Sequence, residues 1–230
     1  MNTLVSMNTR LISIGSLKGG VGKSTITSLI ANYIHFKTNK TVCVVDCDDR
    51  QKTLTYLRET DIDAGFNEDD LYDLVPALNP ELFPEIYVST LKGQYDYVLV
   101  DLPGNTRQAG ILACYMMVDK LFIPTSSSMI DIHSITEFLD DYQQVVDKRK
   151  EEGFKTEIHG FFNKVDKRMN SFKEIYKART MMKIPFMKSF LTDKKSLFAD
   201  NVSTAKAYKD KTNSIFLVDF CEEMFNLIKK

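Results

Sequence analysis

The chain has 230 residues, 27% of them charged, and a formal net charge of −1, which suits a single α/β domain over residues 1–230 whose core needs no disulfide scaffold or structural metal. Its four cysteines are scattered, without a CxxC pair or a histidine at ligand spacing, and so predict buried thiols in a reducing compartment, the cytoplasm. No apolar run approaches the roughly 18 residues that span a bilayer, and the first ten residues lack the pattern of a signal peptide.

Apolar runs alternate with helical periodicity along the chain. Continuous apolar runs predict strands covered on both faces, and apolar residues that recur every three or four positions predict helices. The predicted strands cover residues 11–14, 42–45, 97–100, 121–123 and 158–162, and the predicted helices cover 26–34, 106–117, 130–151, 170–182 and 215–230. Residues 61–94 are acidic and weakly patterned, and predict short surface helices. The alternation indicates an α/β fold with a mainly parallel twisted sheet, helices on both faces and right-handed crossovers.

The string KGGVGKST at residues 18–25 stands where the first predicted strand gives way to a helix, as a phosphate-binding loop requires. Glycines let successive backbone N–H groups point at one centre, and the N-terminus of the following helix adds a partial positive charge. Lys23 is the expected cation for the β- and γ-phosphates, Ser24 a hydroxyl ligand for Mg²⁺ and Thr25 a further donor to the phosphates. The predicted nucleotide-binding residues of the loop are Gly19, Gly20, Val21, Gly22, Lys23, Ser24 and Thr25.

The loop departs from the standard Walker A motif at two positions. Leu17 stands where GxxxxGK[ST] requires a glycine, and Lys18 precedes the glycine pair. The string thereby resembles the deviant Walker A motif of the ParA, MinD and nitrogenase iron protein superfamily, and the resemblance extends from residue 10 to about residue 205. It implies a P-loop ATPase that binds ATP and Mg²⁺ and forms a sandwich dimer, in which Lys18 reaches the partner's nucleotide. The alternative is that Lys18 binds phosphate in its own chain, or only solvent.

An acidic segment follows the second predicted strand, at the sheet edge where open α/β sheets collect their ligand sites. Residues 46–51, DCDDRQ, resemble the family's DxDxQ-like switch I, with one residue more than the usual spacing. By this correspondence Asp48 orients the attacking water and Asp46 lies near the Mg²⁺ shell, while Asp49 is a rival for the water role. A solvated or capping acidic loop is the alternative, because aspartate is common in such turns.

Residues 97–104, YVLVDLPG, match a Walker B motif, in which a buried strand delivers one carboxylate to a metal. Mg²⁺ favours one or two carboxylates together with water and phosphate oxygens, so a single aspartate at a strand end suffices. We expect Asp101 to hold Mg²⁺ through a water. Gly104 and Asn105 stand where a segment that senses the γ-phosphate would begin.

Residues 163–166, NKVD, look like the guanine-reading NKxD motif of GTPases. Related strings occur in ParA-like ATPases, where the asparagine at this strand end is similar to an adenine-contacting residue, and Asn163 is therefore the expected base contact. Asp166 would pair with guanine in a GTP-using switch, or with Lys167 or Arg168 at the surface. The deviant Walker A motif favours ATP.

The charge is divided unevenly along the chain. Residues 1–146 hold 11 Lys and Arg against 19 Asp and Glu, whereas residues 147–230 hold 19 against 12. The basic second half suggests a surface for a polyanion, although lysine-rich helices can also be plain solvated faces. By resemblance, the ATP dimer binds DNA non-specifically at the nucleoid, and a ParB-like partner stimulates hydrolysis during partition or positioning of a plasmid, chromosome locus or mobile element. The candidate DNA contacts are Lys173, Lys177, Arg179, Lys183, Lys188, Lys194, Lys195, Lys206, Lys209 and Lys211.

Three other functions stay open. The segment 215–230 is amphipathic, as in MinD-like proteins that attach to membranes, but the acidic side chains of Asp219, Glu222 and Glu223 favour packing against the sheet instead. A metabolic ATP-dependent ligase of the same fold would need a second motif for its substrate; none is visible, and the three histidines are isolated. A pure binding switch with negligible turnover is conceivable because switch I is longer than usual.

Overall fold

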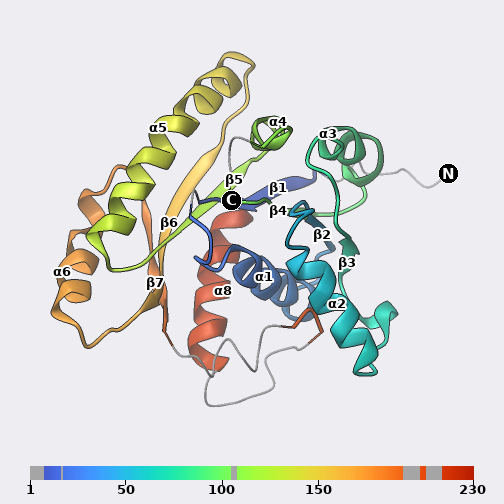
Figure 1. The fold of residues 1–230 in the computed structure, drawn as a ribbon, viewed down its shortest axis with the longest axis horizontal. Helices are drawn as coiled ribbons and strands as arrows, with labels where there is room; N and C mark the ends of the chain where they lie inside the picture. Colours follow the sequence, from blue (N-terminus) through green and yellow to red (C-terminus); the bar gives the residue numbers. More distant parts are fainter. Residues whose placement is uncertain (1–7, 17, 105–107, 194–202, 206–213) are drawn as a thin grey trace.

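A parallel sheet forms the centre of the fold (Figure 1). The computed structural model describes residues 8–16, 18–104, 108–193, 203–205 and 214–230, and of residues 129, 130 and 214–216 the backbone alone. Strands of these residues pair in the order β3-β2-β4-β1-β5-β6-β7, with every pairing parallel. They are β1 Arg10–Ile14, β2 Val42–Asp46, β3 Asp73–Val75, β4 Tyr97–Asp101, β5 Lys120–Thr125, β6 Glu157–Val165 and β7 Phe186–Thr192. The predicted α/β fold is confirmed.

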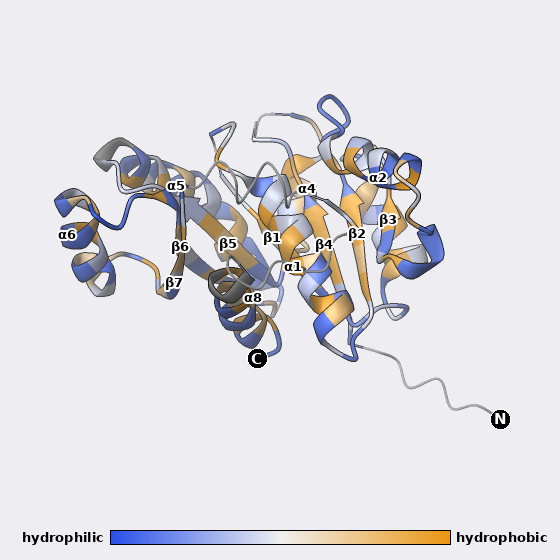
Figure 2. Ribbon diagram, turned by 90° about the horizontal axis from the view of Figure 1, so that it is seen from below, coloured by the Kyte–Doolittle hydropathy of each residue, from blue (hydrophilic) through white to orange (hydrophobic). Residues whose placement is uncertain are grey.

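Helices cover both faces of the sheet. Helices α1 (Lys23–Lys37), α2 (Thr53–Asp63) and α8 (Ser214–Ile228) pack on one face, and α3 (Phe83–Ile86), α4 (Ile111–Tyr115) and α5 (Met129–Glu151) pack on the other. Helix α6 (Asn170–Ala178) covers the end of the sheet formed by β6 and β7 (Figures 1 and 2). Short 3₁₀ turns occupy Glu68–Asp70 (η1) and Arg179–Met181 (η3), and a π-helical turn occupies Tyr87–Leu91 (η2).

The sheet has a hydrophobic core on each face, and alternate side chains of a strand pack into one core or the other, because successive side chains point to opposite faces. In β1, Ile12 packs on the side of α1 and α8, whereas Leu11 packs on the side of α4 and α5. Both positions are fully buried, which explains why the strands appear as continuous apolar runs in the sequence.

The C-terminal helix is part of the first core. Five side chains of α8 are buried there, namely Leu217, Phe220, Cys221, Met224 and Ile228. The prediction that this segment packs against the sheet is confirmed for these side chains. No helix of the described ranges combines the length and the apolar character that crossing a bilayer demands.

A buried polar cluster ties α2 to residues 203–205. Asp61 accepts hydrogen bonds from Ser203 Oγ at 2.7 Å and from the Thr204 backbone N–H at 2.6 Å. Arg58 donates to Thr204 Oγ1 at 2.8 Å and to the Tyr72 carbonyl at 2.7 Å. Buried charges are tolerated when they are hydrogen-bonded in this way, so the cluster fixes this short segment on α2.

Four elements differ from the sequence prediction. Helix α2 is missing from that prediction, which places no helix over residues 53–60. The two edge strands, β3 and β7, are absent from it: β3 has three residues in the acidic region, and β7 interrupts its apolar pattern with Lys188 and Ser189. The helix expected over 106–117 is the five-residue α4, which begins only after Gly110 in a left-handed conformation with φ 82°. Residues 105–107, including the Asn105 of the predicted switch, lie outside the described part of the chain.

Candidate functional site

The predicted phosphate loop connects β1 to α1 at the carboxyl edge of the sheet. Helix α1 begins at Lys23, directly after Gly22, and has no acidic residue in its first turn. Its unpaired N–H groups and partial positive charge therefore face the loop without a neutralising carboxylate on the same helix. Gly22 has φ 92°, and a Cβ atom there would lie 2.8 Å from Asn163 Nδ2, so only glycine fits this position.

Lys23 lies among groups from three predicted motifs. Burial lowers the pKa of its ammonium, while the charges of Asp101 and Asp48 draw that pKa back up. The Gly104 backbone also approaches the ammonium, since a Cβ on Gly104 would lie 3.3 Å from Lys23 Nζ. The structure thus brings the phosphate loop, switch I and the Walker B segment together around one cation.

Asp101 is a buried carboxylate without a full set of partners. It is 1% exposed, and no hydrogen bond of ordinary geometry reaches either carboxylate oxygen from the described residues. Burial raises the pKa of Asp101 to about 7; the Ser24 hydroxyl lowers it, and the neighbouring Asp46 charge raises it further. Asp46 pairs with Asp101 across β2 and β4, so the two aspartates are neighbours at the carboxyl ends of adjacent strands.

This arrangement fits Mg²⁺ bound together with a nucleotide. An orphaned, buried carboxylate is stabilised by a nearby divalent cation, and Ser24 supplies the hydroxyl that a phosphate-loop magnesium site uses. No cluster of three or more His, Cys, Asp or Glu side chains that could hold a metal ion occurs in the described ranges. In such a site, phosphate oxygens and water would complete the coordination shell.

The acidic residues of switch I differ in their partners. Asp46 accepts hydrogen bonds from the Asp48 N–H at 3.2 Å and from the N–H and hydroxyl of Thr55, both at 2.9 Å. Asp48 caps the turn by accepting the Gln51 N–H at 3.0 Å. The roles of Asp46 at the metal and Asp48 at the water stay predictions. In the structure, both carboxylates accept backbone N–H groups and so stabilise the conformation of the segment.

Asp49, the rival for the water role, points to the segment that follows the Walker B strand. Its carboxylate accepts a hydrogen bond from Gln108 Nε2 at 3.2 Å. Because Gln108 follows the predicted γ-phosphate switch, this contact joins the two switch segments directly.

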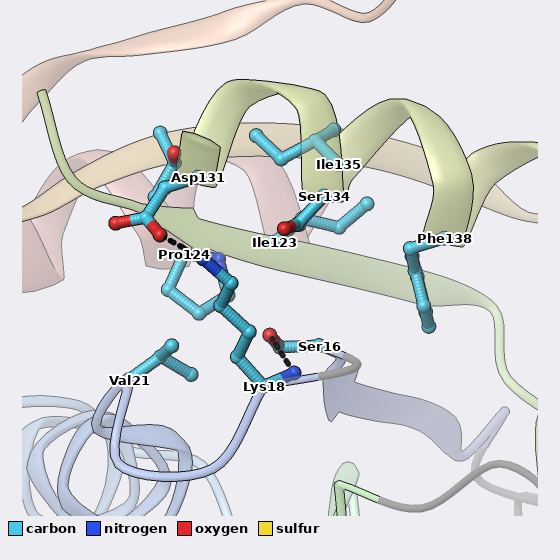
Figure 3. A pocket seen from close by; sticks show the side chains of 10 residues that line it. Ser16, Lys18, Val21, Ile123, Pro124, Asp131, Ser134, Ile135 and Phe138 are labelled. Carbon is cyan, nitrogen blue, oxygen red and sulfur yellow. Dashed lines mark hydrogen bonds and ion pairs between the residues drawn. The ribbon is translucent and has the colours of Figure 1, made fainter. Parts of the chain in front are cut away.

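Lys18 is bound within its own chain, but not as either local alternative supposed. Figure 3 shows its side chain extending from the loop to Asp131, in the first turn of α5, where the two form an ion pair. The Ser126 hydroxyl donates to the same carboxylate. Partial burial alone would raise the pKa of Asp131, but the hydrogen bonds from Lys18 and Ser126 bring it below its usual value. Asp131 carries no motif, so the sequence offers no signal for this partner.

The NKxD-like string at the end of β6 divides into two parts. Asn163, 3% exposed, donates from Nδ2 to the Val21 carbonyl at 2.8 Å, and Lys164 Nζ donates to the Gly20 carbonyl at 2.6 Å. Asp166 is paired with Arg168 at 2.7 Å, as the surface alternative expected. The role of Asn163 as a base contact stays a prediction, and the structure adds that its amide holds the phosphate loop.

The candidate DNA contacts of the described ranges gather at the β7 end of the sheet. Lys173, Lys177, Lys183 and Lys188 are exposed, and Arg179 lies over the Tyr176 ring with its guanidinium carbon 4.1 Å from the centroid. Figure 2 shows α6 mostly in hydrophilic colours. The remaining five candidates, Lys194, Lys195, Lys206, Lys209 and Lys211, lie outside the described part of the chain.

Comparison with known proteins places the chain among nucleotide-binding proteins. Residues 12–204 match the model of the CobQ/CobB/MinD/ParA nucleotide binding domain. A curated relative, the maintenance of carboxysome distribution protein A of Gloeobacter kilaueensis, is 27% identical over 128 residues, which are 56% of this chain and 54% of the relative. The match thus spans about half the length of that relative.

Solved structures share the fold over nearly the whole chain. A putative plasmid partition protein of Borrelia burgdorferi bound to AMPPNP is 19% identical, with a TM-score of 0.66 over 96% of this chain and 100% of that one. A variant of McdA from Cyanothece in complex with ATP is 15% identical, with a TM-score of 0.69 over 95% of this chain and 97% of that one. The family model covers the phosphate loop, both carboxylate motifs and Asn163. The chain therefore belongs to the CobQ/CobB/MinD/ParA nucleotide-binding family.

Proposed function

We propose that the protein is a ParA-like ATPase that forms a sandwich dimer on binding MgATP and uses the cycle of binding and hydrolysis to position a cargo. The observation that carries the proposal is the buried Asp101 carboxylate, left without a full partner set beside Ser24 and Lys23. Such a carboxylate is unfavourable in the protein alone and becomes favourable when a nucleotide-bound cation is close.

Different residues of the site would bind the phosphates, hold the metal ion and orient the attacking water. The N–H groups of residues 19–25 and the Lys23 ammonium would bind the phosphates, and Ser24 and Asp101 would hold Mg²⁺. Bound Mg²⁺ would supply positive charge at the phosphate oxygens. Asp48 orients the attacking water, with Asp49 as the alternative residue for this role. Release of the Asp48 cap from the Gln51 N–H would free the carboxylate for the water.

In the proposed dimer, Lys18 makes the contact that depends on the nucleotide. When triphosphate is bound, Lys18 leaves Asp131 and reaches the nucleotide of the second subunit, where its charge offsets phosphate charge. The ion pair with Asp131 is partly solvated, with Lys18 37% and Asp131 25% exposed, so its loss costs little.

Non-specific DNA is the proposed surface on which the dimer acts. Four exposed lysines lie at one end of each subunit, and dimerisation doubles their number. They are Lys173 and Lys177 of α6, Lys183 between η3 and β7, and Lys188 of β7. If each subunit neutralised three phosphates, the six contacts would give a slope of about −5 in log affinity against log salt concentration. A monomer with half the contacts would bind far more weakly, which would couple attachment to the nucleotide state. A ParB-like partner protein would stimulate hydrolysis and release.

The cargo class is proposed by analogy with the relatives. We propose a plasmid, chromosome locus or mobile element as the cargo. Because the curated relative is named for carboxysome distribution, a carboxysome is a further candidate. A MinD-like membrane role through α8 is disfavoured, because the apolar side chains of that helix are buried against α1 and β7.

Nucleotide binding and dimerisation test the proposal together. Binding of MgATP, MgADP and MgGTP is measured by calorimetry, and mass in solution by light scattering with each nucleotide. We expect binding of ATP, a dimer with ATP only, and retention on non-specific DNA only under the same condition. Asp101→Asn is the matched control, since it keeps the shape of the site and removes the charge for Mg²⁺. A protein that stays monomeric when saturated with ATP would contradict the proposal.

A further inference from the structure

Two consecutive side chains of β6 hold two consecutive carbonyls of the phosphate loop. Asn163 Nδ2 donates to the Val21 carbonyl at 2.8 Å, and Lys164 Nζ donates to the Gly20 carbonyl at 2.6 Å. Lys164 and Gly20 are 144 residues apart in the chain, so the contact is made by the fold. The Asp166 carboxylate is paired with Arg168 instead. The first two residues of the NKxD-like string therefore face the loop.

A bulge in β6 lets both side chains reach the same loop. Phe162 pairs with Phe190 and Val165 with Thr192, so β6 uses three steps where β7 uses two. In a regular strand, neighbouring side chains point to opposite faces, and an extra residue re-aims one of them. Lys164 has φ 55°, a left-handed conformation that lysine rarely adopts and that must be compensated elsewhere. From this conformation the exposed Lys164 side chain donates to the Gly20 carbonyl.

Peptide geometry converts these two contacts into an orientation of the loop N–H groups. The carbonyl of Gly20 and the N–H of Val21 belong to one planar trans peptide unit and point in opposite directions, as do the carbonyl of Val21 and the N–H of Gly22. Holding both carbonyls toward β6 therefore turns both N–H groups away from β6.

We propose that Lys164 is a positioning residue that, together with Asn163, presets the N–H groups of Val21 and Gly22 to bind the phosphate chain of the nucleotide. The inference rests on the proposed function, because it requires the loop to bind a nucleotide. It assigns Lys164 to the phosphate end of the ligand and not to the base. Loss of the ammonium therefore weakens all ligands with the same phosphate chain by the same factor.

The test compares ligands that differ only in the base. Affinities of MgATP, MgGTP and magnesium tripolyphosphate, which has no base, are measured for the wild type and for Lys164→Met. We expect Lys164→Met to weaken all three about tenfold, the effect of removing one charged hydrogen bond. Lys164→Arg, which keeps the charge and donors, should recover part of the affinity.

Two further variants separate positioning from stability. Lys155→Met is the matched control: Lys155 precedes β6 at its other end, its side chain is 80% exposed, and its loss should leave all three affinities unchanged. Lys164→Gly removes the ammonium but relieves the left-handed backbone, so it should keep or raise the melting temperature and still weaken binding.

Each outcome decides between distinct hypotheses. A loss confined to ATP or to GTP would overturn the inference in favour of base reading by Lys164. Unchanged affinities in Lys164→Met, with the wild type binding normally, would overturn the inference and leave the proposed function intact. A wild type that binds none of the three ligands would overturn the proposed function, and this inference with it.

Discussion

The ion pair between Lys18 and Asp131 should oppose dimerisation. Lys18 cannot reach a partner's nucleotide while its ammonium is bound to the first turn of α5. Asp131→Asn removes the charge and keeps the size and the acceptor for Ser126. We therefore predict that this variant dimerises at lower protein concentration than the wild type when MgATP or a non-hydrolysable analogue is saturating.

The size of the effect follows from the exposure of the pair. With Lys18 37% and Asp131 25% exposed, solvent screens the interaction, and a value of about 0.5 to 1 kcal/mol per subunit is appropriate. Each wild-type subunit must break one such ion pair to dimerise, and the Asp131→Asn variant has none to break. Its dimer should therefore be more stable than the wild-type dimer by about 1 to 2 kcal/mol. This corresponds to a rise of roughly 5- to 30-fold in the association constant.

Sedimentation equilibrium measures that constant directly. The control is the same substitution in a Lys18→Ala background, where no ammonium remains to be released and Asp131→Asn should change nothing. The association constants of the wild type and of Asp131→Asn should also become more similar at high salt, because salt weakens a partly exposed ion pair. Equal or weaker dimerisation of Asp131→Asn, in a variant that binds ATP normally, would refute the reasoning.

Four other changes test the remaining parts of the site and fold. Lys23→Ala should abolish ATP binding, measured by calorimetry, because it removes the cation for the β- and γ-phosphates. Burial raises the pKa of Asp101 to about 7, above its unfolded value, so the folded protein holds this proton more tightly. The free energy of unfolding without nucleotide should therefore rise by about 2.5 kcal/mol as pH falls from about 8 to about 5, and urea titrations of Asp101→Asn should lack that pH dependence. The double variant Lys173→Gln, Lys177→Gln should reduce the salt slope of DNA binding by up to about 4 per dimer, whereas an unchanged slope would place the DNA elsewhere. Met224→Ala, at a fully buried position of α8, should cost about 2 to 5 kcal/mol in urea unfolding, and a smaller loss would mean that α8 is not integral to the core.

The sequence predicts most of the sheet and the positions of its motifs, because these depend on local patterns. A buried strand followed by a glycine-rich loop or an aspartate is visible within about ten residues, and parallel strands then bring those strand ends to one edge. The edge strands escape prediction for the opposite reason: β3 has three residues, and β7 mixes apolar and polar side chains. Edge strands are short and half-exposed, so they lack the continuous apolar run of a central strand.

The contacts that the site residues make cannot be predicted from the sequence. Lys18 meets Asp131 across 113 residues, and Lys164 meets Gly20 across 144. Neither contact leaves a local pattern, because an ion pair or a side-chain bond to a carbonyl needs only one residue from each segment. The sequence NKVD matches a motif that contacts the nucleotide base, and it therefore suggested a base contact. The bulge that directs two of its side chains to the phosphate loop depends on the pairing of β6 with β7 and is not visible in the sequence.

The buried contact between α2 and residues 203–205 provides an internal probe of switch I. The Thr204 amide hydrogen is donated to Asp61, and Asp61 lies on the helix that begins at Thr53, two residues after the Gln51 that Asp48 caps. An excursion of α2 that breaks this bond exposes one amide far along the chain to solvent exchange. The exchange rate at Thr204 should therefore report motion that starts in the predicted switch I, without any label on that segment.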